Sequence, residues 1–253
     1  MMIRPPTIPT LFITGTDTDV GKTVVAGAIA DWFRRRGARV GALKPVASGC
    51  VQRREGLVSE DAEFLAHCGD VAYPLEVICP NRYAEPLSPN VAAERAGEPV
   101  DWDAVQRSID LMSRDCDILI VEGAGGIMVP IDGQHLMLDA ARWLNAPAVV
   151  VARPGLGTIN HSVLTVVALR SAGVPVAGVV INRYPVDRAG VAEETNLRQI
   201  ERWTKAPLLA VVPDATIDPS LPSDIVAAVE LTDWASLARA GGGPNDLHGR
   251  RQG

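Results

Sequence analysis

Short runs of valine, isoleucine and leucine alternate along this chain with longer stretches of helical periodicity. Continuous apolar runs of this kind are typical of strands buried on both faces, and a helix after each run is typical of a parallel sheet. The sequence therefore predicts an α/β fold, with a mostly parallel twisted sheet and helices on both of its faces. The expected strands are 10–15, 38–46, a strand in 116–126 that runs into a glycine turn, 146–153, 175–183 and 206–213. The expected helices are 21–37, 59–69, 99–115, 158–173 and 188–204.

The first expected strand runs directly into the segment GTDTDVGKT, residues 15–23. A common phosphate-binding loop has a glycine, four further residues and then Gly-Lys-Thr. Here Gly15 stands one position early, and Thr16 occupies the place of the glycine. Because strand, glycine turn and helix follow in the required order, we interpret the segment as a variant phosphate loop in a single-domain P-loop fold. Backbone N–H groups at the helix start would bind phosphate, Lys22 would reach the outer phosphates, and Thr23 would ligate Mg²⁺.

Two aspartates, Asp17 and Asp19, lie inside this loop although it should hold anions. Like charges about 4 Å apart cost on the order of 4 kcal/mol at an effective dielectric near 20. These side chains therefore face either solvent or a cationic group. For Asp17 a third interpretation is that it braces the turn.

Further charged residues follow other expected strands, at the edge where parallel sheets bind their ligands. Glu122 is expected to end its strand and to provide a carboxylate for phosphate-bound Mg²⁺. Asp61 is a second candidate ligand, although it could equally be a first-turn helix acid like Glu60. Lys44 ends the second strand and would face the same crevice as Lys22, unless it is a surface lysine.

Composition excludes several other classes of protein. The chain has 253 residues, and 47 % of them are hydrophobic. Its net charge is −6, so a nucleic-acid partner is not expected. A membrane is not expected either. The four cysteines form no C-x-x-C pair, and no apolar leader opens the sequence, which favours a reduced, cytoplasmic protein. One domain is expected over 1–238, followed by a Gly-rich polar tail, 239–253, expected to be disordered.

Taken in order, the motifs GTDTDVGKT, KPVASG, VEGAGG, GLGTINH and VINR resemble those of the dethiobiotin synthetase family. The resemblance covers about residues 10–215. It implies a reaction of 7,8-diaminononanoate, CO₂ (or bicarbonate) and ATP. One amine forms a carbamate, ATP phosphorylates that carbamate to a mixed anhydride, and the second amine closes the cyclic urea. It also implies Mg²⁺ as cofactor and a homodimer with the substrate site at its interface.

The resemblance assigns roles to individual residues. Lys22 and Lys44 would stabilise the carbamate and the transferring phosphoryl group, and Mg²⁺ would be held by Thr23, Asp61 and Glu122. The residues implied in nucleotide binding are Asp19, Val20, Gly21, Lys22, Thr23, Val24, Asp61, Glu122, Gly123, Ala124, Gly125, Asn182, Arg183, Val212, Pro213 and Asp214. Within this set Asn182 would read the adenine edge. The residues implied in binding the diamine are Thr18, Ser48, Gly157, Thr158 and Asn160.

Two residues depart from the family pattern. Asp19 stands where the family commonly has Glu, and Arg183 stands where an Asp is often found, which leaves the base preference open. A partitioning-type ATPase switch of the ParA/MinD kind is an alternative, but such proteins usually carry a lysine where this chain has Thr16, and often have a basic or amphipathic tail. A cobyrinic acid amide synthase would need an added glutaminase domain. A nucleotide kinase would need an arginine-rich lid, and residues 82–97 make a poor one; this segment could instead be helical and lie near the diamine.

Overall fold

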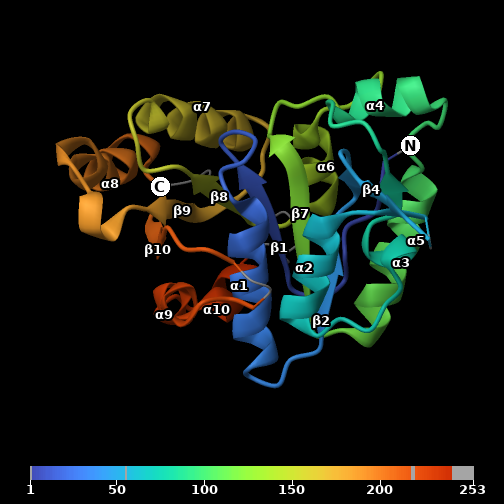
Figure 1. Cartoon of the computed structure of the whole chain (residues 1–253), viewed down its shortest axis with the longest axis horizontal. Coiled ribbons are helices and arrows are strands. Elements are labelled where there is room, and N and C mark those ends of the chain that lie inside the picture. The colour runs from blue at the N-terminus through green and yellow to red at the C-terminus, as the bar shows by residue number, and fades with distance from the viewer. Residues whose placement is uncertain (1, 55, 218–219, 241–253) are drawn as a thin grey trace, which may run out of the picture.

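The computed structural model describes residues 2–54, 56–217 and 220–240. Its centre is a six-stranded sheet in the order β10-β9-β8-β1-β7-β2, in which every pair of neighbouring strands is parallel (Figure 1). The strands of this sheet are β1 (Thr10–Gly15), β2 (Val40–Leu43), β7 (Ile118–Gly126), β8 (Ala148–Ala152), β9 (Val176–Tyr184) and β10 (Leu208–Pro213). The strands β1 and β8 inside the sheet and β2 at its end are buried along their whole length. The predicted α/β fold with a parallel sheet is confirmed.

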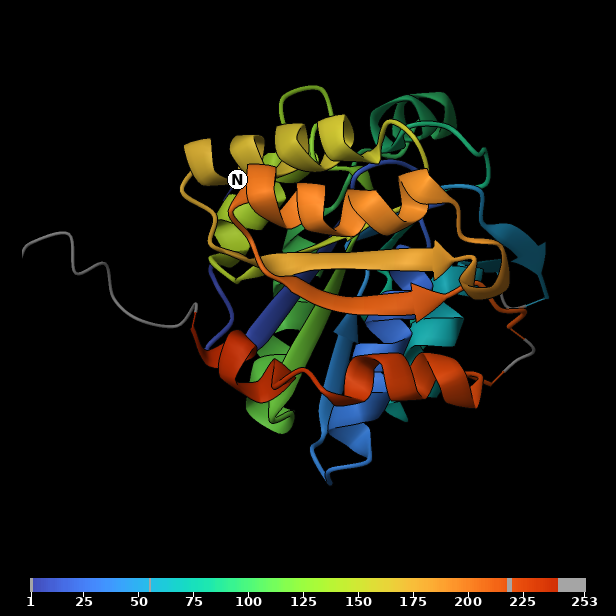
Figure 2. The same ribbon diagram turned by 90° about the vertical axis from the view of Figure 1, so that its left-hand side faces the viewer.

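Helices cover both faces of the sheet. Figure 2 shows α7 and α8 on one face of β9 and β10, and α9 and α10 on the other. The helices are α1 (Lys22–Arg34), α2 (Glu60–Gly69), α3 (Leu75–Ile78), α4 (Pro89–Ala96), α5 (Trp102–Asp115), α6 (Met137–Leu144), α7 (Thr158–Ser171), α8 (Val191–Thr204), α9 (Ser223–Glu230) and α10 (Trp234–Arg239). Short strands β3 (Val46–Ala47) and β6 (Asn81–Arg82) pair in parallel, and β4 (Val51–Arg53) and β5 (Gly56–Val58) form an antiparallel hairpin. Among the described residues no helix is both long and apolar enough to cross a bilayer.

Local signals explain where several helices begin. The Ser59 hydroxyl caps α2 by accepting a hydrogen bond from the backbone N–H of Ala62. The Asp101 carboxylate caps α5 in the same way, by accepting from the N–H of Ala104. These caps set the chain direction on either side of the sheet.

Three expectations about element boundaries were wrong. The expected second strand, 38–46, is split, because β2 ends at Leu43 and the N–H of Lys44 donates to the carbonyl of Ile78 outside the sheet. Glu122 does not end its strand: β7 continues to Gly126, which pairs with Gly15 after a bulge in the register. Of the expected tail, Arg239 belongs to α10, and residues 241–253 lie outside the described residues.

Candidate functional site

A single cleft of about 820 Å³ opens at the carboxyl ends of the strands, around the phosphate loop. The charged side chains that line it are Asp19, Lys22, Lys44, Asp61, Glu122 and Arg183. The cleft also contains the other small or polar predicted residues Thr18, Gly21, Thr23, Val24, Ser48, Ala124 and Gly125. Residues that follow β1 and β2 and residues near the carboxyl ends of β7 and β9 are thereby brought to one place.

Lys44 is the centre of an ion-pair cluster in this cleft. Its Nζ lies 2.8 Å from Oε1 of Glu122 and 2.7 Å from Oδ2 of Asp61. The hydroxyl of Thr23 donates to the same Oε1 of Glu122 at 2.8 Å. The side chain of Lys44 is 5 % exposed and that of Glu122 is fully buried, so both charges are held away from water. Lys44 is therefore not a surface lysine, and Asp61 does more than begin a helix.

The local electrostatics follow from burial and from these contacts. Burial disfavours the charge of Lys44, but the carboxylates of Glu122 and Asp61 outweigh it and raise the pKa of Lys44. Burial, helped by the neighbouring charge of Asp61, raises the pKa of Glu122. For Asp61 burial is the largest single effect and would raise the pKa, but the charge and the hydrogen bond of Lys44, with smaller contributions from Thr23 and Lys22, together outweigh it and lower the pKa. Burial lowers the pKa of Lys22.

Hydrogen bonds within the phosphate loop fix its conformation. Nζ of Lys22 donates to the carbonyl of Asp17 at 3.1 Å, and the Asp17 carboxylate accepts from the N–H of Thr18 at 2.8 Å. Asp17 is exposed and braces the turn, which is the third interpretation given for it above. Asp19 is also exposed and has a left-handed backbone, φ 57°, at the mouth of the cleft.

Asn182, from β9, holds the end of the loop that leads into α1. Its side chain is buried, and Nδ2 donates to the carbonyl of Val20 at 2.9 Å and to that of Gly21 at 3.4 Å. Gly21 has φ 83°, and a Cβ on it would lie 2.0 Å from Nδ2 of Asn182. Only glycine combines this backbone conformation with so close an approach.

The donors in the cleft fit a magnesium ion bound to phosphates. Oε2 of Glu122 is buried and has no hydrogen-bond partner among the described residues, so this carboxylate has spare capacity to accept a cation. Asp61 and the Thr23 hydroxyl lie beside it. Within the described ranges no three His, Cys, Asp or Glu side chains form a complete metal-binding group. Two carboxylates and a hydroxyl are oxygen ligands of the kind that Mg²⁺ prefers.

Two groups of predicted residues lie outside this cleft. Gly157, Thr158 and Asn160 are at the start of α7, where Gly157 is the N-cap with φ 93°, Thr158 is buried and Asn160 is exposed. Val212, Pro213 and Asp214 are at the end of the edge strand β10, beside the end of β9, where the N–H of Asp214 donates to the carbonyl of Tyr184. Of the remaining predicted residues, Val20 is buried below the loop, and Gly123 packs toward Phe12 and Met137.

The sequence analysis missed part of the cleft wall. Pro86, Leu87, Ser88 and Pro89 line it from the segment that leads into α4, and Val129 lines it from the loop after β7. The backbone N–H of Asn90 donates to the carbonyl of Pro130, which joins these two segments. The prolines at 86 and 89 are the sequence signal that could have pointed to this part of the wall. The helix α4 and the position of residues 86–89 in the cleft wall support the earlier suggestion that 82–97 is partly helical and could lie near the diamine.

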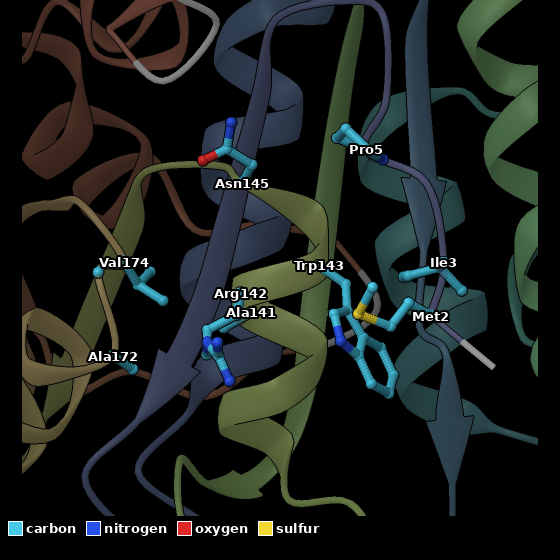
Figure 3. A pocket seen from close by; sticks show the side chains of 10 residues that line it. Met2, Ile3, Pro5, Ala141, Arg142, Trp143, Asn145, Ala172 and Val174 are labelled. Carbon is cyan, nitrogen blue, oxygen red and sulfur yellow. The ribbon is translucent and has the colours of Figure 1, made fainter. Parts of the chain in front are cut away.

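A second cavity, of about 400 Å³, lies at the end of the sheet opposite to the cleft. Figure 3 shows the side chains around it, including Met2 from the N-terminal segment, Trp143 from α6, and Val174 just before β9. Because Asn145 and Val174 precede β8 and β9, this cavity is at the amino ends of the strands. None of the residues assigned above to phosphate, metal or substrate lines it.

Comparisons with known proteins identify the family. A family model described as an AAA domain matches residues 9–217. The ATP-dependent dethiobiotin synthetase of Bacillus cereus is 41 % identical over 203 residues, which cover 80 % of this chain and 82 % of that protein. The chain belongs to the dethiobiotin synthetase family. The Bacillus velezensis member is 35 % identical and covers 91 % of this chain and 98 % of its own length.

A solved structure shows how widely this fold is shared. The MinC:MinD cell division protein complex of Aquifex aeolicus contains a chain that superposes with a TM-score of 0.54 at 14 % identity, covering 96 % of this chain and 99 % of that one. At this level of identity the likeness concerns the fold alone. The MinD-like ATPases are therefore distant from this member of the dethiobiotin synthetase family.

Proposed function

We propose that this chain catalyses the ATP-dependent carboxylation and ring closure of 7,8-diaminononanoate to dethiobiotin. The observation that carries the proposal is the buried Lys44, whose Nζ contacts both Glu122 and Asp61 beside the phosphate loop. This arrangement fixes one cation at the point where the outer phosphate of a loop-bound nucleotide and a carboxylated amine would meet. Membership of the dethiobiotin synthetase family supports the same substrate.

The chemistry needs positioning and charge stabilisation, and no protein nucleophile. A free amine attacks CO₂ and loses a proton to give a carbamate. A carbamate oxygen takes the γ-phosphoryl group and ADP leaves; the second amine then attacks the carbonyl carbon, and phosphate departs as the urea ring closes. Lys22 and Lys44 would stabilise the negative charge on the transferring group. Thr18 and Ser48, which line the same cleft, would contact the diamine or its carbamate.

Thr23, Asp61 and Glu122 would hold Mg²⁺, which when bound neutralises charge on the nucleotide phosphates. The Asn182 amide nitrogen is engaged by the loop, so its carbonyl oxygen is the group left to read the adenine amino group. Gly157, Thr158 and Asn160 would bind the substrate carboxylate at the start of α7, where unpaired N–H groups favour an anion. The roles of Val212, Pro213 and Asp214 in lining the base pocket remain predictions.

The magnesium assignment predicts the effect of Asp61→Asn. We expect the Mg²⁺ concentration needed for half-maximal binding of ATP to rise about 10-fold, because the metal loses an anionic ligand. The measurement is the thermal shift produced by ATP at a series of Mg²⁺ concentrations. Glu60→Gln is the matched control, since Glu60 is the adjacent acid of the same helix turn and its side chain is 72 % exposed. Equal behaviour of the two variants would contradict the assignment.

A homodimer is supported by an apolar stripe on α7. Leu164 and Val167 are 60 % and 55 % exposed, and they share one face of the helix with the exposed Asn160. Leu156, in the loop just before the helix, is 88 % exposed. A second copy of the chain packed on this stripe would cover these side chains and place the start of α7 next to the neighbouring cleft.

The dimer proposal predicts that Leu164→Glu yields a monomer with a raised KM for the diamine, because a charge on the apolar stripe opposes association. Light scattering coupled to gel filtration measures the molar mass. Leu231→Glu is the control, since Leu231 is 97 % exposed and follows α9. A Leu164→Glu protein that remains dimeric would place the interface elsewhere.

The proposed reaction itself is tested by incubating the protein with the diamine, bicarbonate, Mg²⁺ and ATP. The expected product is the cyclic urea, identified by mass, with one ADP and one phosphate formed for each ring. Hydrolysis of ATP at the same rate without the diamine would contradict the proposal and favour a switch ATPase.

A further inference from the structure

Arg183 is a charged residue of the cleft that the resemblance implies in nucleotide binding, but the chemistry above assigns it no particular contact. It lies near the end of β9 and has φ 57°, a left-handed conformation that residues other than glycine rarely adopt. Its side chain lines the cleft, and its Nε lies 3.9 Å from the position that a Cβ on Gly21 would occupy. No carboxylate of the described residues forms an ion pair with it. Arg183 is exposed, so its guanidinium is beside the loop in contact with solvent and is not paired with a carboxylate of the described residues.

The backbone around Arg183 is fixed on both sides. The preceding Asn182 is bonded through its side chain to the carbonyls of Val20 and Gly21. The carbonyl of the following Tyr184 accepts the N–H of Asp214. A residue is held in an unfavoured conformation only where its surroundings determine it, and such residues concentrate at functional sites. Here the effect is to place a cation at the start of α1.

The charge balance of the cleft favours a further cation beside the phosphates of a bound nucleotide. Its lining includes three carboxylates, Asp19, Asp61 and Glu122, against the two lysines Lys22 and Lys44. Lys44 already contacts two of those carboxylates. A nucleotide triphosphate brings several more negative charges into the same space, and Arg183 would add a cation there beside Lys22 and the Mg²⁺ that the acids would hold.

We propose that Arg183 binds the phosphate chain of the nucleotide, together with Lys22 and the N–H groups at the start of α1. This deepens the proposed function, because it rests on ATP being a substrate, but it concerns binding and not ring closure. Arginine suits the task because its planar guanidinium can form two parallel hydrogen bonds to phosphate oxygens. A contact with the base would be the competing use of a side chain in this position.

The test compares how tightly two ligands bind to variants of Arg183 and to a control variant. Arg183→Asn removes the charge and keeps a residue that tolerates the left-handed backbone. Arg198→Asn is the control, because Arg198 is an exposed arginine of α8 with no ion pair among the described residues. Dissociation constants for ATP and for inorganic tripolyphosphate, which lacks base and sugar, are measured by calorimetry with Mg²⁺ present and the diamine absent.

We expect Arg183→Asn to weaken both ligands by about 10-fold, and Arg198→Asn to leave both unchanged. Arg183→Lys should recover part of the loss, and the loss should shrink as salt is raised. A loss confined to ATP would overturn the proposal in favour of a base or sugar contact, and no loss for either ligand would overturn it outright. Because the diamine takes no part, a failed ring-closure assay with normal ATP binding would be a separate result.

Discussion

Replacing Lys44 by methionine is expected to lower kcat for cyclic urea formation by about 100- to 1,000-fold. Lys44 is the buried cation at the point where the phosphoryl group would be transferred, and removing one such stabilising group typically costs this factor. Methionine keeps the length of the side chain and removes only its charge and its donors. The rate is followed by ADP release coupled to formation of the cyclic product.

The same substitution should also destabilise the fold. It leaves Glu122, which is fully buried, and Asp61 without the cation that both contact. Removing one partner of a buried pair costs roughly 3–5 kcal/mol, because the remaining charge is left uncompensated. Thermal unfolding of the protein without ligands measures this effect independently of catalysis.

A double variant separates the two consequences. In Lys44→Met/Glu122→Gln the buried carboxylate is neutral, so most of the lost stability should return while the turnover stays low. If Lys44→Met kept kcat within about threefold of the original protein, the catalytic role would be wrong. If the double variant were no more stable than the single one, the buried pair would not be the source of the destabilisation.

The parts of this molecule that the sequence predicts well are those that local patterns determine. The apolar runs locate all six strands of the main sheet, because strands buried on both faces carry few polar residues. The position of Lys44 and Glu122 near the carboxyl ends of separate expected strands predicts that they share one edge, because parallel strands end at the same edge. The contact between Lys44 and Glu122 is the structural outcome of that rule, whereas Asp61 reaches Lys44 from the first turn of α2.

The parts that the sequence did not predict depend on distant segments. Helices α6, α9 and α10 have only 8, 8 and 6 residues, too few to give a clear periodic signal. The strand order brings β9 and its Asn182 to the phosphate loop through a contact between residues 162 positions apart. No local pattern indicates that the amide nitrogen of Asn182 donates to the loop. The continuation of β7 past Glu122 is another case, because glycines that suggest a turn are held in a strand by pairing with Gly15.

The contact between Asn182 and the loop leads to a second large effect. Gly21→Ala is expected to weaken ATP binding about 100-fold and to lower the free energy of unfolding. A Cβ at this position would lie 2.0 Å from Nδ2 of Asn182, closer than any non-bonded contact allows. The loop or β9 must therefore shift, and the N–H groups that converge on phosphate shift with it; small displacements of this kind can cost 100-fold.

Gly37→Ala is a matched control for the backbone. Gly37 has φ 79°, close to the 83° of Gly21, but a Cβ there would meet nothing within 4 Å. Both substitutions carry the cost of a left-handed alanine, about 1–2 kcal/mol. Only Gly21→Ala adds the clash. We therefore expect Gly37→Ala to lower stability and leave the dissociation constant for ATP unchanged, as measured by calorimetry and thermal unfolding.

Combining Gly21→Ala with Asn182→Ala tests the cause of the clash. The second substitution removes the amide that the new Cβ would meet, and it also removes the hydrogen bonds to the carbonyls of Val20 and Gly21. The double variant should bind ATP more tightly than Gly21→Ala but more weakly than Asn182→Ala, since the left-handed strain persists. If Gly21→Ala bound ATP as the original protein does, the loop would not be held against β9 in the way the structure shows. The position of Arg183 beside the phosphates, which depends on the same anchor, would lose its support as well.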